Sequence, residues 1–65
     1  MSLNWTAQIV GRLHVEKITQ RELAKELDFT EEYVSAILNG KREPVGIQER
    51  MEAAIDAIVT RKGSL

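Results

Sequence analysis

Charged side chains that could bind phosphate groups or accept hydrogen bonds lie close together in the middle of this sequence. Two adjacent acids, Glu31 and Glu32, precede two adjacent bases, Lys41 and Arg42. Adjacent bases can bind phosphate groups, and a carboxylate can accept hydrogen bonds from amino groups. The same residues also suit helix ends, because first-turn acids stabilise a helix by about 0.3–1 kcal/mol each and cations favour its last carbonyls. Both interpretations apply to these four residues.

Catalysis and metal binding are not expected. His14 is the sole histidine and cysteine is absent, so we expect an exposed helix residue at His14 and no metal site. No nucleophile has a base partner, and no Gly-rich phosphate loop is present. We therefore predict no enzymatic activity, no cofactor and no small-molecule substrate. No apolar run approaches the length of a membrane span, so no membrane partner is expected either.

Two short helices joined by a tight turn position these charged residues. Thr19 and Glu22 form a capping box, which predicts a helix over 20–27. A turn follows at 28–29, and a second helix is predicted over 31–38. The acids therefore begin the second helix, and the bases follow its end.

The apolar residues of these helices allow a steep crossing angle, with the small Ala24 where they cross. They are Leu23, Leu27, Phe29, Val34 and Ile37. Thr30 is the expected N-cap of the second helix, and Asn39-Gly40 ends it because both residues tolerate the left-handed conformation. This is the helix-turn-helix arrangement, whose second helix fits the major groove of DNA.

Two further helices are predicted, over 5–14 and about 46–60, which gives an all-α bundle of four main helices in one domain, 1–65. The later helix carries an apolar stripe: Ile47, Met51, Ala54, Ile55 and Ile58. We assign Trp5 to the core as well. Ala53, Ala57 and Val59 widen the stripe beyond what so small a domain easily covers, which predicts a homodimer contact there. Gly63 is expected to end this helix.

Residues 18–44 resemble the DNA-binding domains of phage repressors and of small bacterial regulators of the Xre or Cro/C1 type. The matching residues are Thr19, Gln20, Leu23, Ala24, Leu27, Thr30, Val34, Ile37, Asn39, Gly40, Lys41, Arg42 and Pro44. The sequence departs from the family in Asp28, where glycine is usual, in a single long last helix instead of two short ones, and in acidic Glu31-Glu32. The resemblance implies a lambda-repressor-like fold in a regulator of phage or prophage type.

The resemblance also implies roles for single residues. Contacts to the DNA backbone fall to Gln20, Arg21, Tyr33, Asn39, Gly40, Lys41 and Arg42. Gln20 also fits an ordinary exposed residue of a first helical turn, and Arg21 fits a solvated side chain equally well. The positions that contact bases are Glu31, Glu32, Ser35 and Ala36, and a glutamate there can accept from a cytosine amino group. Tyr33 either donates to a phosphate or packs at the domain edge. Many relatives pair an arginine with an acid where this sequence has Leu13 and Leu38, so we predict an apolar contact there.

The expected function is sequence-specific binding of double-stranded DNA by a repressor-like homodimer in the bacterial cytoplasm or nucleoid. The alternative is a protein-interaction module that kept the fold and does not bind DNA. Net charge −1 and the acids Glu31 and Glu32 favour this alternative, because DNA-binding surfaces are usually basic.

Overall fold

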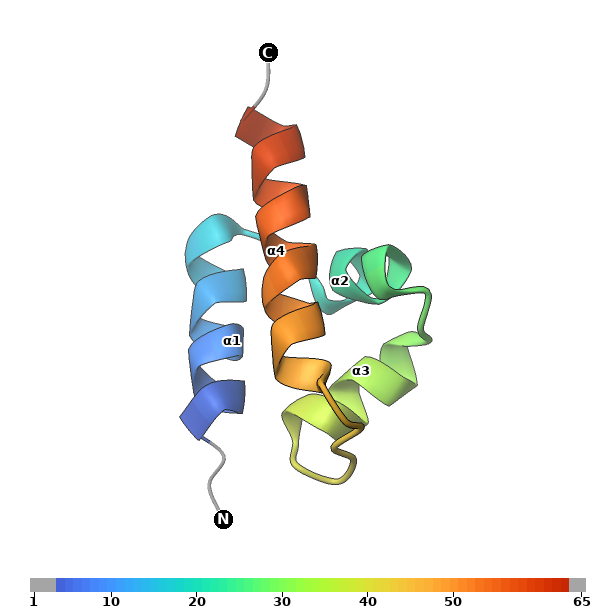
Figure 1. Ribbon diagram of the computed structural model, residues 1–65. Helices are drawn as coiled ribbons and strands as arrows, with labels where there is room; N and C mark the ends of the chain where they lie inside the picture. Colours follow the sequence, from blue (N-terminus) through green and yellow to red (C-terminus); the bar gives the residue numbers. More distant parts are fainter. Residues whose placement is uncertain (1–3, 64–65) are drawn as a thin grey trace.

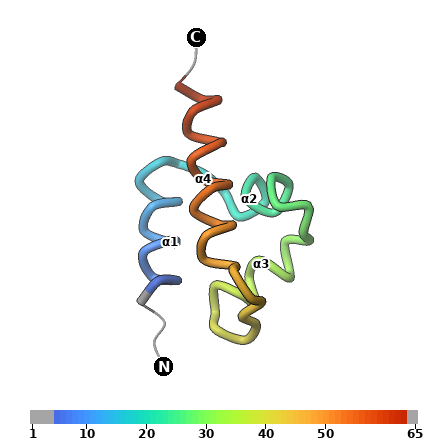
Figure 2. The backbone as a smooth tube through the Cα atoms, viewed as in Figure 1, coloured from blue at the N-terminus to red at the C-terminus, as the bar shows by residue number. Residues whose placement is uncertain are grey.

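The computed structural model describes residues 4–63, which form four α-helices and no strand (Figure 1). The bounds are Asn4–Glu16 for α1, Gln20–Leu27 for α2, Glu31–Leu38 for α3 and Ile47–Gly63 for α4. α1 and α4 run side by side in the same direction, and α2 and α3 lie together on one side of α4 (Figure 2). The expected all-α fold is confirmed, and α2 and α3 have the expected bounds.

One hydrophobic core joins the four helices. Its largest fully buried side chains are Leu23, Val34, Ile37, Met51 and Ile55. Nine further buried residues complete it: Ile9, Leu13, Ile18, Ala24, Leu27, Leu38, Ile47, Ala54 and Ile58. The whole apolar stripe of α4 therefore faces the core as predicted. Trp5, predicted as core, is half-buried and packs against this cluster.

α1 is longer than predicted, because it continues through Val15 to Glu16. It ends where Lys17 takes a left-handed conformation with φ of 59°. The Ile18 amide then donates to the Leu13 carbonyl at 2.8 Å, and the Lys17 amide donates to the His14 carbonyl at 3.2 Å. These two bonds make a Schellman-type cap, in which a lysine occupies the position that glycine usually fills.

α4 also differs from its predicted range of 46–60. Gly46 precedes the helix in a left-handed conformation with φ of 73°, and the helix continues past Thr60 to Gly63, its last residue and the one expected to end it. Val59 is half-buried, whereas Ala53 and Ala57 are exposed on the outer side of α4. A single long helix does replace the two short ones usual in the family, as expected.

Leu13 on α1 and Leu38 on α3 are both buried in the same core cluster. Both side chains are therefore core residues, whereas the replacement of an ion pair and a direct contact between the two leucines stay predictions. Within residues 4–63, no helix combines the length and apolar character that crossing a membrane requires.

Candidate nucleic-acid interface

The first helix of the motif begins with the predicted capping box. The Thr19 hydroxyl accepts from the Glu22 amide at 3.1 Å, and the Thr19 amide donates to the Glu22 carboxylate at 2.9 Å. Gln20 and Arg21 follow in the first turn of α2, and both are exposed. Two backbone donors at the helix end are thus satisfied, and both polar side chains are left on the surface.

The turn between α2 and α3 has a left-handed residue at Asp28, with φ of 63°. The Phe29 amide donates to the Ala24 carbonyl at 2.8 Å, which closes the end of α2. The Thr30 hydroxyl accepts from the Tyr33 amide at 3.0 Å and caps α3 as predicted. Ala24 is only 3% exposed, as a small residue at the helix crossing should be. Aspartate therefore adopts the left-handed conformation at the turn position where the family resemblance implies glycine.

The face of α3 that was predicted to be buried lies against the core, and the start of its predicted outer face lies in solvent. Val34 and Ile37 are fully buried, and Glu31 and Glu32 are exposed as expected. Ser35 and Ala36, predicted on the exposed side, are half-buried. Ser35 and Ala36 nevertheless lie on the same face of α3 as Glu32, because they follow it by three and four residues.

Tyr33 packs at the domain edge, which is one of the two positions considered for it. Its ring meets Phe29 edge-on, with centroids 4.9 Å apart and planes at 87°. The guanidinium carbon of Arg50, on α4, lies 5.1 Å from the Phe29 ring centroid. Arg50 was not predicted to contact the motif, since no pattern in the sequence joins it to a turn so far away along the chain. The cluster joins the turn and the first turn of α3 to a side chain of α4.

α3 ends at Asn39-Gly40 as predicted, but only Gly40 is left-handed, with φ of 81°. Asn39 keeps φ of −89°, and its side-chain amide donates to the Ser35 hydroxyl at 3.3 Å. The Lys41 amide donates to the Ala36 carbonyl at 2.8 Å. The side chains of Lys41 and Arg42 are exposed and make no hydrogen bond or ion pair within residues 4–63. Both are therefore available to an external anion.

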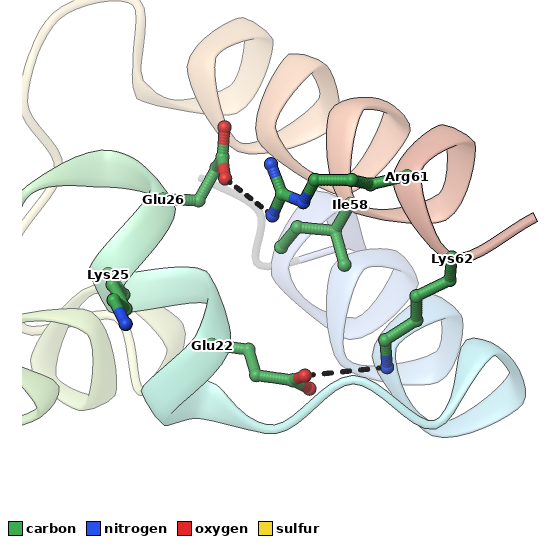
Figure 3. Close-up of a pocket in the computed structure, with 6 residues that line it drawn as sticks. All are labelled: Glu22, Lys25, Glu26, Ile58, Arg61 and Lys62. Carbon is green, nitrogen blue, oxygen red and sulfur yellow. Dashed lines mark hydrogen bonds and ion pairs between the residues drawn. The ribbon is translucent and has the colours of Figure 1, made fainter. Parts of the chain in front are cut away.

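The acids of α2 are paired with the end of α4 (Figure 3). Arg61 donates to Glu26 at 2.9 Å, and the Lys62 ammonium lies 3.5 Å from the Glu22 carboxylate. Lys62 also donates to the Lys17 carbonyl at 3.2 Å. The hydrogen bond from the Thr19 amide, assisted by the charge of Lys62, holds the pKa of the Glu22 carboxyl below its ordinary value of 4.5. The positive charges of α4 thus compensate both acids of α2.

Other candidate chemistry is not assembled in residues 4–63. His14 is exposed on α1, as predicted, and no group of three or more His, Cys, Asp or Glu side chains in this part of the chain has the arrangement of a metal site. The predicted DNA-facing residues instead lie along α2, α3 and the loop after α3.

Comparison with known proteins identifies this same region. The family model described as "Helix-turn-helix" matches residues 16–44, which cover α2, the turn, α3 and the following loop through Pro44, a little under half of the chain. Neither the comparison with curated proteins nor that with solved structures gave a match. With its capped α2, left-handed turn and buried crossing at Ala24, segment 16–44 belongs to the phage-repressor-like, Cro/C1-type helix-turn-helix family of DNA-binding regulators.

Proposed function

We propose that this protein binds double-stranded DNA at specific sequences and regulates transcription as a repressor-like protein of a phage or prophage. One observation carries the proposal. Within a helix-turn-helix, α3 presents exposed polar side chains at its start, and the loop after it carries Lys41 and Arg42, which make no ion pair within residues 4–63. A helix with exposed polar side chains can enter the major groove, while cations beside it meet the phosphates.

Lys41 and Arg42 are the principal proposed phosphate ligands. Their backbone is fixed by the left-handed Gly40 and by the bond from the Lys41 amide to Ala36, so the loop holds both cations close to the end of α3. The exposed Gln20 side chain adds a contact at the start of α2. The Tyr33 hydroxyl remains a proposed donor to phosphate, because the ring of a tyrosine can pack against a neighbour while its hydroxyl donates a hydrogen bond.

The base contacts are proposed for Glu31, Glu32, Ser35 and Ala36. A carboxylate accepts from the cytosine amino group in the major groove, and a small apolar side chain can meet a thymine methyl group. The Ser35 hydroxyl already accepts from Asn39, so it also helps to orient that amide. Asn39 thereby lies beside the proposed base-contacting residue Ser35, and it is itself a proposed contact to the DNA backbone.

The protein is proposed to act as a homodimer in the bacterial cytoplasm or nucleoid. One module of this size covers few base pairs, so useful specificity calls for two copies on a two-fold site. The exposed Ala53 and Ala57 on α4 would allow two such helices to approach closely. Light scattering at high micromolar concentration tests this contact, and a monomer there leaves only dimerisation on DNA.

The test of DNA binding uses Lys41→Gln and Arg42→Gln. Each should weaken binding on every duplex and reduce the slope of log Kd against log salt by about one unit. Lys17→Gln is the control, because it removes a cation at the end of α1 and should leave the slope unchanged. If wild-type protein at micromolar concentration shifts no random duplex at low salt, DNA binding is refuted and the protein-interaction function is favoured.

A further inference from the structure

The two acids that begin α3 have different surroundings. The Arg21 Nε atom lies 3.8 Å from the Glu31 carboxylate, across the turn that joins α2 to α3. Glu32 makes no hydrogen bond or ion pair with any residue in 4–63. From the sequence, Glu31 and Glu32 are equivalent candidates for a base contact. Among residues 4–63, the fold gives a cationic partner to Glu31 and not to Glu32.

We infer that Arg21 is a positioning residue and that Glu31, rather than Glu32, is the acid that determines specificity by accepting from a cytosine amino group. This inference rests on the proposed DNA binding. A carboxylate that enters the major groove is repelled by the phosphates on both sides. Arg21 offsets that repulsion at Glu31 and restricts where its carboxylate can lie, whereas Glu32 has no ion pair within residues 4–63 that would hold its carboxylate in place.

The exposure of the pair supports a function in binding rather than in folding. The side chain of Arg21 is 82% exposed and that of Glu31 is 50% exposed. Ion pairs this exposed contribute little to stability because water screens both charges. A guanidinium has five N–H donors, so Arg21 can remain beside Glu31 and still donate to a phosphate at the start of α2. Lys25, one turn further along α2, is exposed and has no such partner within residues 4–63.

The experiment starts from a duplex selected out of random DNA by the wild-type protein. Affinity is then measured for every single-base variant of that duplex, with wild-type protein, Arg21→Gln, Glu31→Gln and the double variant. Glu31→Gln should reduce discrimination at one cytosine position by roughly 5- to 150-fold. Arg21→Gln should reduce discrimination at that same position, and the double variant should lose little more than Glu31→Gln alone.

Lys25→Gln is the matched control, because it removes one positive charge from the same helix and should retain discrimination at the cytosine position. Glu32→Gln decides between the two acids, because it removes the other proposed base contact and should strengthen binding on all duplexes alike. Circular dichroism of each variant shows whether its fold is retained, which these exposed positions should allow.

The inference is overturned if Arg21→Gln weakens all duplexes equally and its effect adds to that of Glu31→Gln, since Arg21 would then be a phosphate contact alone. It is also overturned if Glu32→Gln, and not Glu31→Gln, removes the discrimination. In both results sequence-specific binding by wild-type protein persists, so the proposed function stands. If wild-type protein selects no duplex, both the proposed function and the inference fail.

Discussion

Leu38 should be a residue on which the whole fold depends. Its side chain is 8% exposed and belongs to the core cluster that also contains Leu13. Leu38→Ala removes three buried carbon atoms, which corresponds to about 2.4 kcal/mol of lost transfer free energy at about 0.8 kcal/mol each. The cavity left behind raises the expected loss to about 2–5 kcal/mol.

This loss is large for so short a chain. At roughly 0.05–0.15 kcal/mol per residue, a domain of this length has a free energy of unfolding of about 3–10 kcal/mol. Leu38→Ala should therefore leave the protein marginally folded or unfolded. Urea unfolding followed by far-ultraviolet circular dichroism measures the change. Val15→Ala is the control, because Val15 is 73% exposed on α1 and its truncation should change the free energy of unfolding by no more than about 0.5 kcal/mol.

A Leu38→Ala protein as stable as wild type would refute the assignment of this side chain to the core. A double-mutant cycle with Leu13→Ala then tests the predicted contact between the two leucines. Coupling of about 0.5 kcal/mol or more is expected for side chains that touch, and strictly additive losses would show that they are only members of one core.

Three further predictions concern the helix ends. Thr19→Ala should lower the free energy of unfolding by about 1 kcal/mol in urea, because the capping box loses its hydroxyl acceptor; an unchanged midpoint would contradict this. The lowered pKa of Glu22 gives stability that is present above its ordinary pKa of 4.5 and is lost as pH falls through the folded-state pKa. Glu22→Gln should accordingly lower Tm at neutral pH and reduce the loss of Tm on acidification below about pH 4.5. Lys17→Gly and Asp28→Gly should each raise stability by a few tenths to about 1 kcal/mol, because both residues occupy left-handed conformations that favour glycine. A loss of stability in either variant would show that the replaced side chain contributes more than its backbone costs.

The motif itself could be predicted because local rules determine both of its helices. The hydroxyl caps of Thr19 and Thr30 fix where α2 and α3 begin, and Gly40 fixes where α3 ends. Each of these features involves residues within one or two helical turns of each other. The spacing of these residues in the sequence is therefore enough to predict where the helices begin and end.

The end of α1 and the partners of the last turns of α4 could not be predicted in this way. Lys17 is left-handed although lysine has no preference for that conformation, and the residue after it, Ile18, is buried in the core. The tertiary burial of Ile18 accounts for a turn that local propensity does not favour. α4 continues past Thr60 where Arg61 and Lys62 pair with α2, and these partners are distant along the chain.

In the candidate interface, the sequence predicted which side chains of α3 face inward or outward, but it did not predict which side chains pair with each other. The helical period placed Val34 and Ile37 inward and the two acids outward. The pairing of Arg21 with Glu31 depends on how the left-handed Asp28 brings α2 and α3 together, and the approach of Arg50 to Phe29 depends on α4. Such contacts arise from tertiary geometry, which side-chain spacing does not encode.

Net charge is a poor guide to whether this protein binds DNA, because charged side chains from outside the motif pair with side chains within it. Segment 16–44 has two more acidic than basic side chains, which by itself would oppose approach to phosphates. Arg61 and Lys62 of α4 bring two positive charges to Glu26 and Glu22 and so offset that excess. The cations of the motif are then freer to act on an external anion, because the acids of α2 already have partners. The last turns of α4 therefore set the charge of the motif as well as extending the helix.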